Sequence, residues 1–416
     1  MKRSRKLLVV CLAALFLVAI VAACASDPDP EPVAAPTPAP ADTATEPAQA
    51  EPEPEPEPAP ADLEPILVGG AFAFTTPVNM TDQFAIEGFL MAVEEINAAG
   101  GIAGRQIEYF TEDTGDDPTT AVNAYNRLID QHGVSFIIGP SFTNQHLAVE
   151  PIVRENEILV FGMSTNIRLI QDYEWYIRVR PSDGIACSAA ALFAIDEMGA
   201  TRIGITHTNN DFGNGGRDIL IDVLATRGLE PVAVETFDPD DRDLSPMLLS
   251  MRDADAEVII HWGHAADSAV AQTQNVQLGI NLPMIVSPGA VAVTSIEMAD
   301  GATDGNFGIV DVLLDARTDE RSLQWIADYN ARWGRDPGVP QSMAAYDAVY
   351  LLKAAIEAAG GSLNTTEVRD AVLGITMQGV SGYFQFPEPI GEALWSVDII
   401  QFDYMTPVFV RTVAVG

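Results

Sequence analysis

Ile66-Leu67-Val68-Gly69-Gly70-Ala71-Phe72 is an unbroken run of apolar and small residues, the pattern of a strand that is buried on both faces. A set of apolar or small residues at helical spacing follows it: Phe84, Gly88, Met91, Ala92 and Ile96. The pair Gly100-Gly101 then ends this predicted helix. A buried strand that leads directly into a helix is the repeating unit of a parallel sheet.

The same alternation continues through most of the chain. Further strands are predicted at residues 105–110, 134–138, 158–161, 202–206, 232–236, 258–261 and 284–286. Helices are predicted between them at residues 117–129, 144–155, 186–198, 216–226, 246–252 and 267–277, with Asp117 as the N-cap of the first. Two such runs predict an α/β fold of two doubly wound lobes, each a parallel sheet covered by helices on both faces.

After residue 311 the pattern changes. Long helices are predicted at residues 320–332 and 342–358, a shorter one at 366–373, and antiparallel strands near 383–386, 396–402 and 408–413. Ligands of open parallel sheets bind beyond the carboxyl ends of the strands. Two lobes that face each other therefore form a cleft that can close around a solute, which makes binding the first hypothesis for function.

Composition limits the classes of partner. The 416 residues include 59 Asp and Glu against 22 Lys and Arg, a formal net charge of −37, and 48% of them are hydrophobic. This length suits about two or three folded domains. Because so acidic a surface repels phosphate groups, nucleic acids and anionic lipid surfaces are excluded as partners.

The sequence lacks the familiar motifs of catalysis and cofactor binding. It contains no GxSxG, HExxH or GxxxxGK[ST] pattern and only five histidines, so we predict neither an enzyme nor a bound cofactor. Its three cysteines form no CxxC pair, and two histidines alone, His261 and His264, make a poor metal site. No metal is therefore predicted.

The N-terminus has the pattern of an export signal followed by an anchor. Basic residues at positions 2–6 precede an apolar run at 7–23, and Val21-Ala22-Ala23-Cys24 resembles a bacterial lipobox. We interpret residues 1–23 as a lipoprotein signal peptide and Cys24 as the lipidated residue. The alternative is an uncleaved transmembrane helix, for which the run is slightly short. Residues 24–62, rich in Pro, Glu and Ala, predict a disordered tether for an extracytoplasmic, lipid-anchored head.

Motifs in fixed order run along the predicted head. They are Glu95-Ile96-Asn97-Ala98-Ala99-Gly100-Gly101-Ile102-Ala103-Gly104-Arg105, Ile137-Ile138-Gly139-Pro140-Ser141, the predicted turn Asp211-Phe212-Gly213-Asn214-Gly215, and Ala345-Tyr346-Asp347-Ala348-Val349. Each is weak alone, but their order and spacing are specific. Together they resemble the solute-binding proteins that feed branched-chain amino acid ABC importers, and the match runs from about residue 66 to the end.

That resemblance implies a type I periplasmic-binding fold, with lobe 1 formed by residues 66–182 and 312–385 and lobe 2 by residues 183–311 and 386–416. Hinge strands join the lobes in this family. The resemblance further implies that an amino acid or similar small polar solute selects the closed state, and that the closed head then docks on an ABC permease. An extracytoplasmic sensing module of the same fold uses the same cleft, so that alternative stays open.

The resemblance also implies which residues of lobe 1 hold a solute carboxylate. Ser141 and Thr143 occupy one matching loop, and Ser164 and Thr165 occupy the other. The first pair lies at the start of the helix predicted from Asn144, where free N–H groups favour an anion. The alternative for any one of these hydroxyls is simple helix capping.

In lobe 2 the resemblance points to Phe212 as an aromatic lid and to His264 at a position where relatives often carry a tyrosine. For Phe212 the alternative is a ring packed beneath a Gly-rich turn. If His264 faces the cleft, ligand affinity is expected to depend on pH between about 5.5 and 7.5, where an ordinary histidine titrates.

Departures from the family pattern bear on the choice of ligand. The acid that holds an amino group in branched-chain amino acid binders would align at Ser287-Pro288-Gly289, the expected aromatic near Gln341 is missing, and Thr81 stands at a tyrosine position. A buried ammonium without a partner is costly. Either another acid serves, with Asp82 and Asp267 as candidates, or the ligand lacks an α-amino group, which leaves carboxylates, amides and urea-like solutes open.

Overall fold

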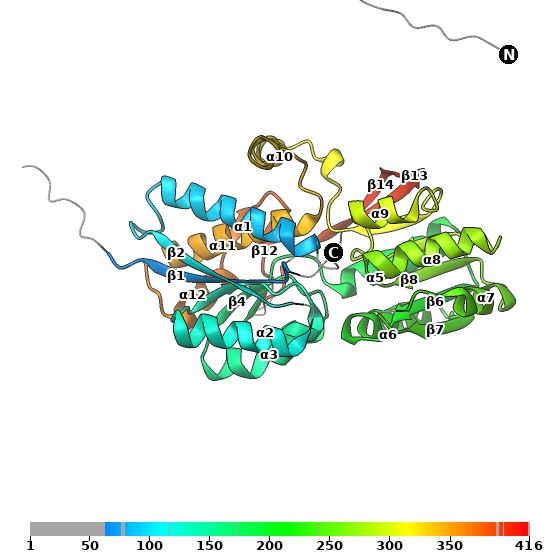
Figure 1. Ribbon diagram of the computed structural model, residues 1–416, viewed down its shortest axis with the longest axis horizontal. Helices are drawn as coiled ribbons and strands as arrows, with labels where there is room; N and C mark the ends of the chain where they lie inside the picture. Colours follow the sequence, from blue (N-terminus) through cyan, green and yellow to red (C-terminus); the bar gives the residue numbers. More distant parts are fainter. Residues whose placement is uncertain are drawn as a thin grey trace, which may run out of the picture. The chain divides into compact units, whose positions relative to one another are not determined.

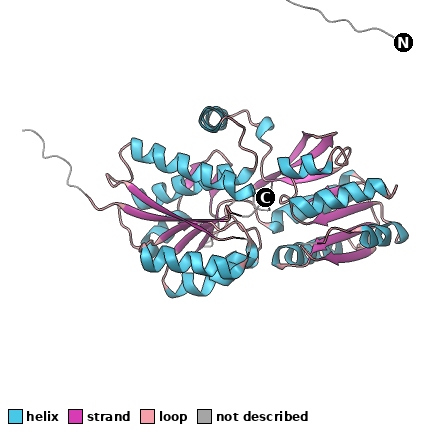
Figure 2. Ribbon diagram, in the orientation of Figure 1, coloured by secondary structure: helices cyan, strands magenta, loops and turns pink. Residues whose placement is uncertain are grey.

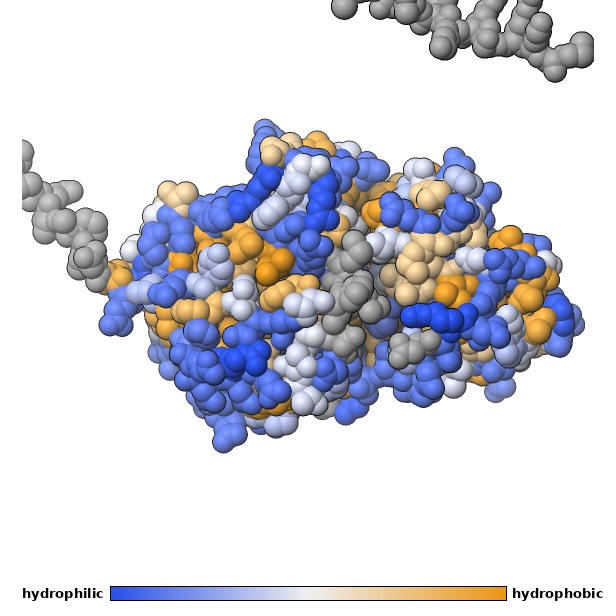
Figure 3. Space-filling view, viewed as in Figure 1, coloured by the Kyte–Doolittle hydropathy of each residue, from blue (hydrophilic) through white to orange (hydrophobic). Residues whose placement is uncertain are grey.

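The computed structural model describes residues 63–75, 80–115, 117–171, 173–239, 241–387, 391–393 and 395–414 (Figure 1). The predicted signal peptide, the lipidated Cys24 and the tether lie outside these residues. Within the described ranges, no helix has the length and apolar character needed to cross a bilayer. Helices accompany both main sheets (Figure 2), and polar residues cover much of the face seen in Figure 3.

The first sheet contains five parallel strands in the order β2-β1-β3-β4-β5. They are β1 (Ile66–Phe72), β2 (Ile107–Asp113), β3 (Phe136–Ile138), β4 (Leu159–Gly162) and β5 (Tyr176–Arg178). The helices that alternate with them are α1 (Met80–Ala98), α2 (Pro118–Asn126) with the π-helical turn η1 (Arg127–Gln131), α3 (Thr143–Glu155) and α4 (Arg168–Gln171). Asp117 caps α2 as predicted, because its Oδ1 accepts the N–H groups of Thr119 and Thr120.

The second sheet contains seven strands in the order β14-β13-β10-β9-β8-β6-β7, of which β6 to β10 run parallel and β13 and β14 antiparallel. Its strands are β6 (Ile203–Thr208), β7 (Ala233–Phe237), β8 (Val258–Trp262), β9 (Met284–Val286), β10 (Phe307–Val310), β13 (Ser396–Asp403) and β14 (Thr406–Ala414). Its helices are α5 (Asp183–Leu192) with η2 (Phe193–Glu197), α6 (Asp211–Thr226), α7 (Ser245–Asp253), α8 (Ala265–Gln277) and α9 (Val293–Ala299).

The chain passes between the two sheets after β5, after β10 and after β12. Between the second and third passage lie η3 (Leu314–Ala316), α10 (Glu320–Trp333), α11 (Pro340–Ala358), α12 (Thr365–Leu373) and the small antiparallel pair β11 (Thr376–Gln378) and β12 (Tyr383–Gln385). Two sheets with parallel strands and interleaved helices confirm the predicted α/β fold class.

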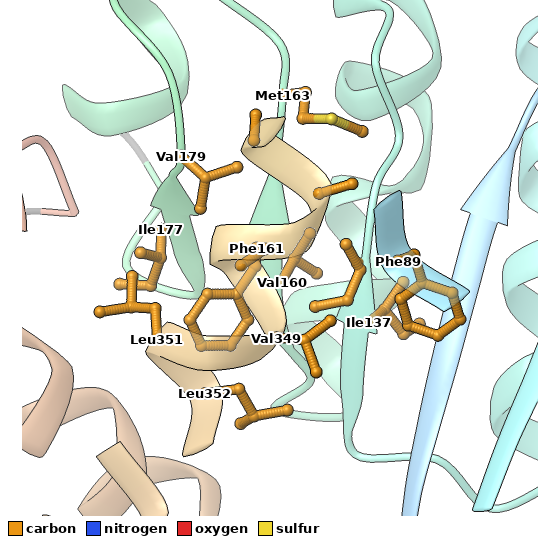
Figure 4. Packing of buried hydrophobic residues seen from close by; sticks show 14 of the residues in the cluster. Phe89, Ile137, Val160, Phe161, Met163, Ile177, Val179, Val349, Leu351 and Leu352 are labelled. Atoms are coloured by element: carbon orange, nitrogen blue, oxygen red, sulfur yellow. The ribbon is translucent and has the colours of Figure 1, made fainter. Parts of the chain in front are cut away.

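The largest hydrophobic core surrounds the first sheet and includes α11, most of which is buried. Figure 4 shows Val349 and Leu352 of α11 beside Phe161 of β4. Phe386 and Trp395 also pack in this core, although the sequence analysis placed both in lobe 2. Three smaller clusters fill the second sheet and its helices.

Helices α1 and α11 touch each other at Gly88. A Cβ atom placed on Gly88 would overlap the carbonyl oxygen of Ser342 in the first turn of α11. Because glycine has no Cβ atom, the backbones of the two helices can come into contact here. The helices can therefore cover the same face of the first sheet together.

Candidate functional site

A pocket of about 430 Å³ lies where the two sheets face each other. Its walls come from the segments that follow β3, β4, β5, β6, β7, β8 and β9, together with the first turns of α1 and α11. These segments begin at the carboxyl ends of parallel strands from both sheets, where ligands of such folds bind. The pocket is thus shared by the two halves of the molecule.

Five of the six predicted ligand residues line this pocket: Ser141, Thr143, Thr165, Phe212 and His264. Ser164 does not. Its side chain is fully buried outside the lining, and its carbonyl oxygen accepts the Tyr176 hydroxyl at 2.7 Å. Its neighbour Thr165 lines the pocket, and the buried Ser164 hydroxyl has no hydrogen-bond partner among the described residues, so contact between Ser164 and a solute stays a prediction.

Four further residues were named where the sequence departs from the family pattern, and three of them line the pocket. Thr81, Gln341 and Asp267 line the pocket. Asp82 is buried outside the lining, where its Oδ2 accepts the N–H of Ala73 at 2.8 Å. Of the two acids proposed from the sequence as partners for an amino group, only Asp267 stands at the pocket wall.

The loop before α3 presents groups suited to an anion. Helix α3 has Phe142 as its N-cap residue and no side-chain capping hydrogen bond, so helix capping does not explain the neighbouring hydroxyls. The hydroxyl oxygen of Ser141 is buried, and a hydrogen bond from it to the carboxyl of Asp82 opposes the rise that burial causes in the pKa of that acid. Thr143, the first residue of α3, is 5% exposed. An uncapped helix N-terminus beside two hydroxyls favours a carboxylate.

An acid that the sequence analysis did not name as a site residue also lines the pocket. Asp183 begins α5, lines the pocket and is fully buried. Burial raises the pKa of Asp183 to about 7, although a hydrogen bond from the Thr165 side chain and the positive charges of Arg178 and Arg180 oppose this rise. A carboxylate in this position is well placed to receive a cationic donor.

Asp267, in the first turn of α8, is the second acid of the pocket wall. It is 3% exposed, and its Oδ1 accepts the N–H of Ser268 at 3.2 Å. Burial raises its pKa to about 7. Asp183 and Asp267 are thus the two carboxylates among the residues that line the pocket.

Buried arginines fix the segments that carry the site. Arg178 is fully buried and donates from its two terminal nitrogens to the carbonyl oxygens of Thr165 and Asn166, each at 2.7 Å. Its Nε lies 3.4 Å from a carboxylate oxygen of Glu392, which precedes β13. Arg180 holds Asp311 through two hydrogen bonds of 2.7 and 3.0 Å. The two guanidinium groups therefore connect the three chain segments that cross from one sheet to the other.

Aromatic rings meet across the pocket. The ring of His264 stacks on Phe212, with centroids 4.7 Å apart, and meets the edge of Phe142 from the first half at 6.0 Å. Desolvation lowers the pKa of His264 to about 4. With this pKa the imidazole stays neutral between pH 5.5 and 7.5. Titration of His264 would then not change ligand affinity in that range, contrary to the prediction from the sequence.

Residues 211–215 form the first turn of α6, where the sequence predicted a turn that precedes the helix. Asn210 caps the helix through Gly213 N–H. The side chain of Asn166, from the first half, donates to the carbonyl oxygen of Asp211 at 3.0 Å. A Cβ atom on Gly215 would lie 2.6 Å from Asn166 Nδ2, so glycine permits this contact between the halves.

The described residues contain no group of three or more His, Cys, Asp or Glu side chains that could hold a metal ion. His261 is fully buried, and its Nδ1 lies 2.8 Å from the hydroxyl of Thr206. Cys187 is a buried free thiol whose sulfur lies 3.6 Å from the carbonyl oxygen of Gly216.

The raised pKa of Asp183 predicts that the difference in folding stability between wild type and Asp183→Asn depends on pH. The folded state binds the Asp183 proton below a pKa of about 7, whereas the unfolded state releases it near 3.8. The wild type therefore loses stability relative to the asparagine variant as pH rises from 5 to 8, by a free energy on the order of 2 kcal/mol. Urea unfolding of both ligand-free proteins at several pH values measures this difference. A difference in free energy of unfolding that does not change with pH would contradict a buried carboxyl group with a raised pKa.

Comparison with known proteins agrees with this architecture. Residues 65–397 match the family model described as periplasmic binding protein. The chain is 25% identical over 342 residues to Leu/Ile/Val-binding protein homolog 3 of Brucella melitensis, which covers 81% of this chain and 91% of that protein.

Solved structures resemble the head as well. A leucine binding protein from Thermotoga maritima aligns with a TM-score of 0.78 and 25% identity, covering 84% of this chain and 98% of that one. A branched-chain amino acid transporter substrate binding protein from Streptococcus pneumoniae, in complex with isoleucine, aligns with a TM-score of 0.75 and 21% identity, covering 84% and 99%.

The fold and the shared pocket define a two-lobed α/β binding protein. The chain belongs to the periplasmic binding protein family. The resemblance to branched-chain amino acid binding proteins that the sequence motifs indicated is thereby confirmed.

Proposed function

We propose that this protein is the extracytoplasmic receptor of an ABC importer and captures an amino acid or a similar zwitterion between its lobes. One observation supports the proposal: the hydroxyl-bearing N-terminus of α3 and the fully buried acid Asp183 line the same pocket, which the two sheets share. Family membership and the named relatives support the transport role.

The proposed polarity of the bound solute follows from the charges on the walls. The solute carboxylate lies at the start of α3, where Ser141 and Thr143 donate hydroxyl hydrogen bonds together with backbone N–H groups. The ammonium group is proposed to lie at Asp183, a fully buried acid that lines the pocket. Ionised Asp183 then gains a charge-assisted hydrogen bond, which is stronger than a neutral one.

Closure is proposed as a hinge motion of two lobes, with residues 66–182 and 312–385 in lobe 1 and 183–311 and 386–416 in lobe 2. The packing of Phe386 and Trp395 in the first core supports moving the last boundary toward β13. We further propose that lipid on Cys24 holds the protein at the membrane, within reach of the permease that receives the closed form.

A thermal-shift screen of amino acids, amides, urea and small carboxylates tests the proposal. At 100 times its Kd, a solute that binds only the folded protein adds about 2.7 kcal/mol of apparent stability. Thr143→Val removes one hydroxyl at nearly constant volume. It is expected to lower the affinity for that solute at least about tenfold.

Thr226→Val is the matched control, because Thr226 is exposed on α6 outside the pocket lining. Mass spectrometry of the recovered solute shows whether it is released unchanged. If no α-amino acid stabilises the protein, or if Thr143→Val binds as wild type does, the proposed solute class and its orientation are wrong.

A further inference from the structure

We infer that the solute carries an uncharged, hydrogen-bonding side chain, such as an amide or a hydroxyl, and not the aliphatic side chain of leucine, isoleucine or valine. This inference rests on the proposed function and deepens it. It depends on the pocket groups that remain after the solute carboxylate and ammonium have been placed.

Gln341 is the main such group. It stands in the first turn of α11, lines the pocket and is 6% exposed. Its Oε1 is buried and has no hydrogen-bond partner among the described residues. The sequence resemblance places an aromatic residue here in aliphatic binders, whereas an amide must find a partner once a solute displaces water from the pocket.

The second lobe adds polar groups to the same cavity. Asn210 at the start of α6 lines the pocket beside Phe212. His264 also lines the pocket with its imidazole ring. A neutral imidazole carries one donor and one acceptor nitrogen, which an aliphatic side chain cannot satisfy.

Asp267 and Arg242 place one charge of each sign on the pocket lining, and because these charges act on each other they offer no net attraction to a charged side chain. Asp267, 3% exposed, repels a second carboxylate on the solute. Arg242, which is exposed and forms no ion pair with another described residue, repels a cationic side chain at the same cavity. A neutral side chain with a donor and an acceptor meets both residues without repulsion and can bond to Gln341.

Solutes of equal size provide the sharpest test. Leucine, asparagine and aspartate have the same side-chain skeleton, and valine and threonine form a second matched pair. By calorimetric titration, asparagine is expected to bind at least about tenfold tighter than leucine and aspartate, and threonine tighter than valine, because an unpaired buried polar group costs about that factor.

Gln341→Leu is expected to reduce the preference for asparagine over leucine by at least about tenfold. The control Gln324→Leu changes an exposed glutamine of α10 that bonds to Asp328 and lies outside the pocket lining, and it is expected to keep the wild-type preference. Tighter binding of leucine or aspartate than of asparagine by the wild type would overturn this inference alone. Absence of binding by every amino acid would overturn the proposed function and the inference with it.

Discussion

Arg178→Met is expected to lower the free energy of unfolding by about 3–5 kcal/mol and to weaken solute binding. The buried guanidinium is the hydrogen-bond donor to the carbonyl oxygens of Thr165 and Asn166 and the cation beside Glu392. Methionine fills a similar volume, but it leaves two buried acceptors without donors and a carboxylate without its counterion, which is the costly way to break a buried ion pair.

The matched control for this change is Arg168→Met. Arg168, in α4, is exposed and close in sequence to the same loop, so its replacement is expected to change stability by less than about 0.5 kcal/mol. Urea unfolding measures the stabilities, and calorimetric titration measures the affinity. A loss of less than 1 kcal/mol on Arg178→Met would show that Arg178 does not hold the site loop.

Gly88→Ala is expected to lower the free energy of unfolding by about 3 kcal/mol. The added methyl group overlaps the carbonyl oxygen of Ser342, a backbone atom that cannot rotate away, so α1 and α11 must move apart. Overpacking of this kind typically costs 1–3 kcal/mol, and a rigid backbone neighbour places this site at the upper end.

Gly374→Ala serves as the control for that substitution. Gly374 ends α12 with a negative φ, and the atom nearest to a built Cβ lies 3.5 Å away, an ordinary contact distance. Chemical denaturation is expected to show little change for the control. If both alanine variants unfold at the same urea concentration, α1 and α11 do not meet as closely as described.

Much of this fold follows from local pattern. Long amphipathic helices and apolar strands such as α1 and β1 repeat the periods of their secondary structure, so the sequence predicts them. Several short elements were not predicted: β5, β10, β11, α4, α9 and η3. Strand β5 is three residues long and contains the buried Arg178, whose polarity hides it from any apolar pattern. Its burial is intelligible only when Thr165, Asn166 and Glu392 are in place around it.

The candidate site was predictable by segment and less so by residue. Ser164 and Thr165 are adjacent hydroxyl residues of the same matching loop. Both are buried, and only the fold shows that Thr165 lines the pocket while Ser164 does not. Asp183 was missed because an acid at the start of an Ala-rich helix indicates ordinary helix-dipole stabilisation. Its complete burial depends on distant segments that no local pattern reveals.

The hydrogen bond from Asn166 to the Asp211 carbonyl spans the cleft without belonging to the pocket lining. Such a bond typically contributes about 0.5–1.5 kcal/mol net. Because the solute does not take part in this bond, its contribution is the same for every solute. Differences in affinity between solutes therefore come from the residues that line the pocket. If the protein releases its solute to a permease as proposed, this bond must break before the two halves can separate.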